Sequence, residues 1–216
     1  MRLRSPSASF GSAVEVTTLR LARALDLHLL QEAAVAVVLR GGSLREAEVL
    51  LVRRALKAGD PWSGHVALPG GRRAASDVDL LATALRETHE EVGLALALEG
   101  RQAAADRLVR GQLLGTLPPV YTVAPARDAP LGLAALPMVV RPYVLRLDGP
   151  AEPRLSSEVT GIRWVPLAAL HDPARRTQWP WRFLGVQWPA PAWDLDGDIV
   201  WGLTHQMLSA LLRALH

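Results

Sequence analysis

The sequence contains no cysteine. Disulfide bonds, thiolate metal sites and cysteine nucleophiles are therefore excluded. Lysine is nearly absent as well, because Lys57 is the only lysine among 24 basic residues and the others are arginines. Arginine suits bidentate contacts with phosphate groups. The lack of thiols agrees with a reducing compartment, and we expect a cytoplasmic protein.

Long apolar runs and blocks of positive charge are also missing. The longest uncharged apolar run, about Leu131 to Val140, is interrupted by Pro137 and is far shorter than the roughly 20 residues that span a bilayer. Arg2 and Arg4 are followed by small and polar residues, so we expect no secretory signal. The net charge is only +3. We therefore expect neither a membrane nor a nucleic acid as a partner.

The chain has 216 residues, half of them hydrophobic, which is enough for one domain with a substantial core. We expect a loose tail over residues 1–13 and a single domain over residues 14–216. Apolar periodicity predicts an N-terminal helix at Thr17–Leu30 and a β-hairpin made by strands at Ala33–Leu39 and Glu48–Arg54. Further strands are predicted at His65–Leu68, Gly111–Thr122, Met138–Leu147 and Val159–Val165, helical segments at Val78–Val92, Pro166–His171 and Trp201–Leu212, and a hairpin turn at Asp196-Gly197.

Acidic residues are concentrated in the segment from Arg86 to Glu91. On a helix, Glu87 lies three and four positions before Glu90 and Glu91, so these carboxylates project from one face and repel each other. A hard divalent cation such as Mg²⁺ would relieve that repulsion, since it prefers oxygen ligands. The alternative is an acidic face that is simply solvated.

The residues around this segment delimit a loop and a helix. Pro69-Gly70-Gly71 is expected to form a turn, Ser76 and Asp79 have the spacing of a capping box, and Gly93 is placed to end the helix. A strand, a glycine loop and an acidic helix are therefore expected in succession.

This stretch resembles the signature of the Nudix hydrolases, in which a glycine and an acidic residue precede Arg-Glu-x-x-Glu-Glu-x-Gly and an apolar residue. The matching positions are Gly71, Asp77, Arg86, Glu87, Glu90, Glu91, Gly93 and Leu94. There are two departures: eight residues separate Asp77 from Arg86 where seven are usual, and Asp77 replaces the commoner glutamate. The longer interval and the run Thr83 to Glu87 resemble the coenzyme A pyrophosphatase branch. The resemblance implies an α/β fold, an α/β/α sandwich with a mixed sheet, as the order of the predicted elements also does.

The resemblance also implies roles for individual residues. Glu87, Glu90, Glu91 and the carbonyl of Gly71 would hold Mg²⁺ or Mn²⁺ ions, and Arg86 would hold Glu90 and the region of Asp77 in place. The general base is left open between Glu87 and Glu158, because Glu158 is an acidic residue just before a predicted strand and some family members use a glutamate outside the signature. A phosphoanhydride resists attack because its oxygens repel a nucleophile, and bound cations neutralise that charge.

Substrate contacts are expected near the glycine loop, from Gly70 and from cationic or polar side chains at Arg54, His65, Arg72 and Arg73. A structural role for His65 is the alternative. His89 is expected to point outward, without a zinc role. Six of the seven tryptophans lie between residues 164 and 201, and they could include a platform on which a base stacks.

We expect a small-molecule partner, coenzyme A or an acyl derivative, cut to a phosphopantetheine and adenosine 3',5'-bisphosphate. Nucleoside triphosphates, ADP-ribose and other nucleoside diphosphate derivatives are the alternatives within the family. A module that binds nucleotides without hydrolysing them is the alternative from another class, and the intact set of three glutamates argues against it. A homodimer is possible on this sequence.

Overall fold

The computed structural model describes residues 30–43, 46–58, 63–101, 108–125, 135–183 and 186–215. Within them, nine strands form a mixed sheet in which six follow the order β3-β2-β1-β8-β6-β5, while β4 pairs with β1, β7 with β8 and β9 with β2. Their bounds are β1 (Gln31–Arg40), β2 (Glu48–Arg54), β3 (Val66–Ala67), β4 (Gly70–Arg72), β5 (Ala95–Ala97), β6 (Leu108–Thr116), β7 (Val120–Pro125), β8 (Ala135–Leu147) and β9 (Val159–Pro166). β1 runs parallel to β8 and antiparallel to β2, which makes the sheet mixed.

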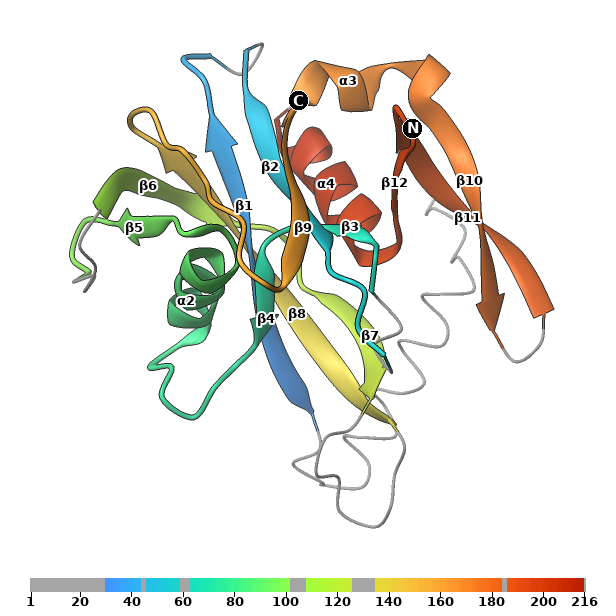
Figure 1. Ribbon diagram of the computed structural model, residues 1–216, viewed down its shortest axis with the longest axis horizontal. Helices are drawn as coiled ribbons and strands as arrows, with labels where there is room; N and C mark the ends of the chain where they lie inside the picture. Colours follow the sequence, from blue (N-terminus) through green and yellow to red (C-terminus); the bar gives the residue numbers. More distant parts are fainter. Residues whose placement is uncertain are drawn as a thin grey trace, which may run out of the picture.

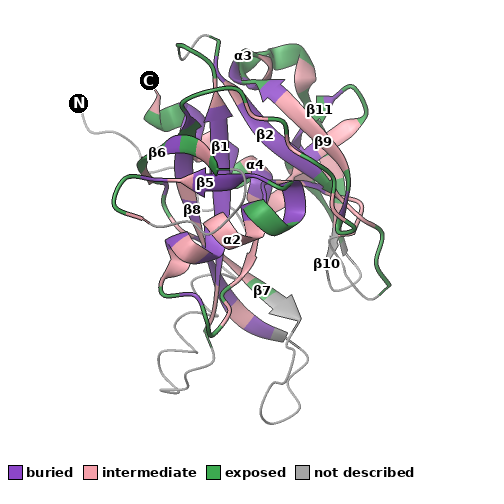
Figure 2. Ribbon diagram, turned by 60° about the vertical axis from the view of Figure 1, so that its left-hand side comes forward, coloured by how far each residue is buried: buried purple, intermediate pink, exposed green. Residues whose placement is uncertain are grey.

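Helices cover both faces of this sheet (Figure 1). Helix α2 (Leu80–Val92) packs on one face, while α3 (Leu167–His171) and α4 (Gly202–Ala214) pack on the other. Residues of β1 alternate between the two cores: Val35 and Val37 face α4, whereas Ala34 and Ala36 face α2. Figure 2 shows β1 and β2 largely buried between the layers. The α/β/α arrangement expected from the sequence is confirmed.

A second, three-stranded sheet has the order β10-β11-β12 and consists of β10 (Arg176–Phe183), β11 (Val186–Leu195) and β12 (Asp198–Trp201). A short 3₁₀ turn, η2 (Pro173–Arg175), leads into it from α3. β12 lies beside β3, so the small sheet borders the main one (Figure 1). The turn between β11 and β12 has positive φ at Asp196 (60°) and Gly197 (92°), which confirms the predicted hairpin turn.

Several predicted elements are confirmed and others are wrong. The β1–β2 hairpin is present, and α2, α3 and α4 lie within two residues of their predicted bounds. The single strand predicted at Gly111–Thr122 is two strands, β6 and β7, interrupted at residues 117–119. β5, β10, β11 and β12 were not predicted. The helix expected at Thr17–Leu30 and the tail over residues 1–13 lie outside the described residues, except for Leu30. No helix of the described residues combines the length and the apolarity needed to cross a membrane.

Two details of the glycine loop also differ from the prediction. Gly70 and Gly71 are not in a turn but in β4, where they pair with Val35 and Ala34 of β1. The helix is capped by Asp79, whose side chain accepts a hydrogen bond from the backbone N–H of Ala82, and not by Ser76. Gly93 ends the helix in the left-handed region (φ 68°) as expected, and its N–H donates to the carbonyl of His89.

Candidate active site

Arg86, in the middle of α2, donates hydrogen bonds to several parts of the site. Its Nε and Nη2 donate to the two carboxylate oxygens of Asp77 at 2.9 and 3.0 Å, and its Nη2 also donates to the carbonyl of Arg72 at 3.1 Å. Its Nη1 donates to Glu87 at 2.9 Å and to Glu90 at 2.7 Å. One guanidinium therefore joins the β4 strand, the loop before α2 and two helix carboxylates, which is the positioning role predicted for it.

Asp77 is the buried anchor of this arrangement. It also accepts hydrogen bonds from the hydroxyl of Thr83 and the backbone N–H of Ala74. The bond from Arg86 is the main cause that lowers the pKa of Asp77 to about 2, so this carboxylate stays charged at any physiological pH. Charge-assisted bonds of this kind hold the loop between β4 and α2 in one conformation.

Glu91 lies at the bottom of the site, where only 2% of the residue is exposed. One carboxylate oxygen accepts a hydrogen bond of 3.0 Å from the backbone N–H of Gly70, and the other lies 3.8 Å from Nη1 of Arg54. Burial outweighs both contacts and, with repulsion from Glu87 and Glu158, raises the pKa of Glu91 to about 7. The site therefore contains more negative charge than its neighbouring cations compensate.

Glu87 projects from α2 towards β4. A methyl group added at Gly71 would lie 2.4 Å from its carboxylate, so only glycine allows the strand and this side chain to approach so closely. Burial is the main cause that raises the pKa of Glu87; Arg86 opposes it, and the charges of Glu90 and Glu158 add to it. His89 is exposed, as predicted, and Glu90 beside it is exposed as well, although it was predicted to share a face with Glu87 and Glu91.

Glu158 approaches the site from the start of β9. Its carbonyl accepts a hydrogen bond of 2.8 Å from the N–H of Ala55, which follows β2 and Arg54 directly. Its charge contributes to the raised pKa of both Glu87 and Glu91. The structure thus brings a carboxylate from outside the acidic helix to the same site, although some 70 residues separate them in sequence.

The chemistry of the donors fits a divalent cation, since carboxylates with raised pKa values gain most from a nearby positive charge. Glu87, Glu90, Glu91 and the carbonyl of Gly71 are the groups that would hold it. Within the described ranges, however, no three acidic or histidine side chains surround a common point. Arg86 bonds one carboxylate oxygen of Glu87 and one of Glu90, and each carboxylate has a second oxygen with which it could bind a cation.

Of the residues predicted to contact substrate, some lie beside Glu91 and others form bonds elsewhere. Arg54 ends β2 beside Glu91, and Gly70 uses its N–H for Glu91. Arg73 donates to Glu32 at 2.8 Å and lies against the carbonyls of Asp77 and Val78. Arg72 contributes its carbonyl to Arg86. Arg54 is therefore the predicted cation that lies nearest the buried glutamate.

Aromatic rings at His65, Trp179 and Trp201 lie together on the border between the two sheets. Trp179 and Trp201 are stacked, with ring centroids 5.8 Å apart. The many tryptophans between residues 164 and 201 suggested an aromatic platform from the sequence. The sequence did not show that Trp179 and Trp201 form it, because the strands that carry these two residues were not predicted.

A family model described as the NUDIX domain matches residues 30–185. An uncharacterized protein of Schizosaccharomyces pombe is 36% identical over 132 residues, which are 60% of this chain and 35% of that protein, so the match spans about a third of the relative's length. Among solved structures, a NUDIX hydrolase from Alicyclobacillus acidocaldarius is 26% identical with a TM-score of 0.45, over 65% of this chain and 81% of the other. The NUDIX domain of Shewanella oneidensis NrtR, solved with ADP ribose, is 20% identical with a TM-score of 0.45, over 73% and 86%.

Proposed function

Because this chain belongs to the NUDIX domain family, we propose that it is a hydrolase that cleaves the phosphoanhydride bond of a nucleoside diphosphate-linked substrate with a divalent cation, Mg²⁺ or Mn²⁺. The observation that carries the proposal is the group formed by the half-buried Glu87, the buried Glu91 and the exposed Glu158. Burial, with a smaller contribution from the neighbouring carboxylate charges, raises the pKa of Glu87 and Glu91. A bound cation would neutralise charge on the phosphate oxygens and make water a better nucleophile at neutral pH.

The chain's own residues have separable tasks in this proposal. Arg54, beside Glu91, is placed to contact a phosphate oxygen, and Arg86 keeps Glu87 and the loop after β4 in position. Glu91 is buried and engaged by Gly70, so it suits holding a cation better than moving a proton. Glu87 and Glu158 are the candidates for the base that takes the proton from water.

We further propose coenzyme A or an acyl-coenzyme A as the substrate, with a phosphopantetheine and adenosine 3',5'-bisphosphate as products. The eight-residue interval between Asp77 and Arg86 and the run Thr83 to Glu87 support this choice. The 3'-phosphate of coenzyme A requires a cationic partner. Arg54, Arg72 and Arg73 are the candidates for reading that phosphate.

Purified protein tests the proposal in a turnover screen with Mg²⁺ or Mn²⁺ against coenzyme A, ADP-ribose, NADH, dinucleoside polyphosphates and nucleoside triphosphates. A charge-assisted contact to the 3'-phosphate should favour coenzyme A over dephospho-coenzyme A by about ten- to a hundredfold in kcat/KM. Faster turnover of ADP-ribose or a nucleoside triphosphate would contradict coenzyme A as the substrate, while the proposed hydrolase activity would still stand. Absence of turnover on every phosphoanhydride, with tight nucleotide binding, would favour a binding module.

A further inference from the structure

His65, Trp179 and Trp201 form a compact aromatic cluster. The His65 ring meets Trp201 edge-on, with centroids 5.2 Å apart and planes at 74°, and meets Trp179 at 6.4 Å and 77°. All three residues are only half-buried. The cluster therefore presents aromatic surface to solvent as well as to its own members.

Other tryptophans among the described residues have different surroundings. Trp193 is 4% exposed in the main core and packs on His205 with centroids 4.1 Å apart. Trp164 lies under the guanidinium of Arg40, which is 4.2 Å from its ring centroid. Trp188 is 40% exposed on β11. Core packing accounts for Trp193, but it does not account for two half-buried tryptophans stacked at the border of two sheets.

Backbone bonds connect the cluster to the active site through Arg54. The N–H of Arg54 donates to the carbonyl of His65 at 3.0 Å, and its carbonyl accepts from the N–H of Gly64 at 3.1 Å. Two residues before β3 thus face one residue of β2, the pattern of a β-bulge, which changes the direction of side chains at that point. The side chain of the same Arg54 lies 3.8 Å from Glu91. Arg54 therefore bonds His65 through its backbone and lies beside the acidic group with its side chain.

We propose that the cluster of His65, Trp179 and Trp201 is the surface on which the planar heteroaromatic base of the nucleotide stacks, with Arg54 between the base and the acidic group to contact the phosphates. Base stacking on aromatic rings is sequence-tolerant and adds to affinity without any charge. Trp201 lies outside the part of the chain that the family model matches. The inference deepens the proposed function and rests on it for the identity of the substrate class.

Tryptophan fluorescence tests the proposal without catalysis. AMP contains a base and a phosphate but no phosphoanhydride, so the protein cannot hydrolyse it; ribose 5-phosphate lacks only the base. AMP is expected to quench the fluorescence of the full-length protein in a saturable manner, and ribose 5-phosphate is not. The variants Trp179→Leu and Trp201→Leu are expected to bind AMP roughly ten- to a hundredfold more weakly, while Trp179→Phe and Trp201→Phe retain most of the affinity.

Trp164→Leu is the matched control, because Trp164 is also half-buried but lies on β9 under Arg40 and not in the cluster. It should bind AMP as the wild type does. Melting curves identify any leucine variant that fails to fold, and His65→Leu, which leaves the tryptophan pair intact, provides an independent test with an expected rise in KM for the nucleotide substrate. Equal binding of AMP and ribose 5-phosphate, or unchanged AMP affinity in folded leucine variants, would overturn the proposal. Saturable quenching by AMP in a protein that hydrolyses none of the phosphoanhydride compounds of the turnover screen would overturn the proposed function and leave this site standing.

Discussion

Glu91 combines burial, a backbone hydrogen bond from Gly70 and a raised pKa. Its replacement by glutamine removes charge and little volume, and the amide oxygen can still accept from Gly70. We expect Glu91→Gln to lower kcat by on the order of a hundredfold or more, since cation-assisted activation of water contributes several kcal/mol. Steady-state kinetics at saturating Mg²⁺ measure this. Near wild-type activity would show that Glu91 takes no part in the metal site.

The pKa of Glu91 makes a separate prediction for stability in the absence of metal. The ordinary pKa of 4.5 is raised to about 7, so the native state keeps a proton that the unfolded chain releases between these values. The stabilisation is complete below about pH 4.5 and is lost as the pH rises through about 7. In chelator, the free energy of unfolding should therefore fall over this range by on the order of 3 kcal/mol more in the wild type than in Glu91→Gln. Urea unfolding of both proteins at pH 5 and pH 8 tests this. An equal change in the free energy of unfolding between the two pH values in both proteins would contradict the raised pKa of Glu91.

Glu158 can be separated from the metal-binding carboxylates by its phenotype. If it is the general base, Glu158→Gln should lower kcat by about a hundredfold or more while metal affinity stays close to wild type. Isothermal titration with Mn²⁺ and kinetics across a range of Mg²⁺ concentrations provide the two measurements. Weaker metal binding with recovery at high Mg²⁺ would make Glu158 a ligand instead, and no change in either would favour Glu87 as the base.

At the scale of elements, β4 brings two glycines into contact with different neighbours. A methyl group at Gly71 would meet the movable end of Glu87, whereas at Gly70 it would lie 2.4 Å from the carbonyl oxygen of Ala34 and 2.6 Å from the Cα of Val35, in a backbone with φ of 157°. Gly71→Ala should therefore displace Glu87 and lower kcat by about a hundredfold with a small change in Tm. Gly70→Ala should cost about 2 kcal/mol or more of stability.

Thermal melts and kinetics on the same two variants separate these outcomes. Gly93, which ends α2 with φ of 68°, offers a control outside the site: Gly93→Ala should cost about 1 kcal/mol with little effect on kcat. A Gly71→Ala variant that keeps wild-type kcat would show that the close approach of β4 and Glu87 is not needed for catalysis.

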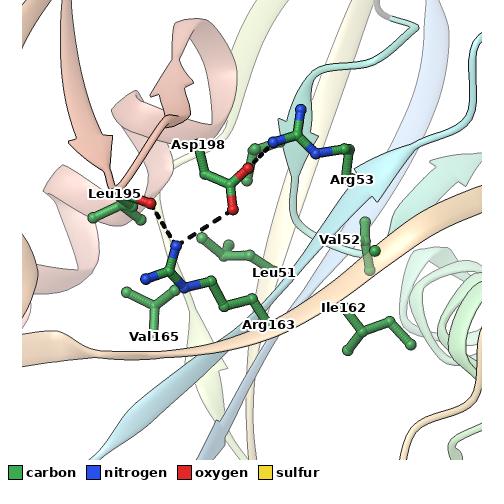
Figure 3. A pocket seen from close by; sticks show the side chains of 10 residues that line it. Leu51, Val52, Arg53, Ile162, Arg163, Val165, Leu195 and Asp198 are labelled. Carbon is green, nitrogen blue, oxygen red and sulfur yellow. Dashed lines mark hydrogen bonds and ion pairs between the residues drawn. The ribbon is translucent and has the colours of Figure 1, made fainter.

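At the scale of the whole molecule, a network of ion pairs fastens the small sheet to the main one. Figure 3 shows Asp198 of β12 between Arg53 of β2 and Arg163 of β9, with Arg163 also reaching the carbonyl of Leu195. These residues line a cavity of about 170 Å³ between the sheets. The network keeps β12, and with it Trp201, in place beside β3.

The carboxylate of Asp198 pairs with two arginines, so Asp198→Asn should lower the free energy of unfolding by about 1 kcal/mol. The loss of a single exposed ion pair should lower it by less. The matched control is Asp148→Asn, whose partner Arg146 lies 3.8 Å away and is 45% exposed; it should cost less than about 0.5 kcal/mol. Urea unfolding of both variants measures the difference. An equal loss of unfolding free energy in the two variants would mean that the network of Asp198 adds no stability beyond an exposed ion pair. A raised KM in Asp198→Asn alone would link this network to the aromatic cluster.

Features that depend on local spacing were predictable from the sequence. Helical periodicity placed Glu87, Glu90 and Glu91 on α2, and the position of Gly93 predicted the end of that helix. The family resemblance implied that Arg86 holds the region of Asp77. The alternation of apolar residues likewise predicted the β1–β2 hairpin. Each of these signals is carried by residues close together in the chain, where geometry follows directly from the backbone.

Tertiary structure decided the remainder. Both Ser76 and Asp79 can cap a helix, and Asp79 does so where the loop before it is held by the buried bonds of Asp77 to Arg86 and Thr83. Prolines argue against strands, yet β10 and β11 pair with Pro180 opposite Pro189, where neither residue has an N–H to leave unsatisfied. The meeting of Glu158 with the acidic helix, and of His65 with Trp179 and Trp201, depends on strand pairing between distant segments, which local propensity does not encode.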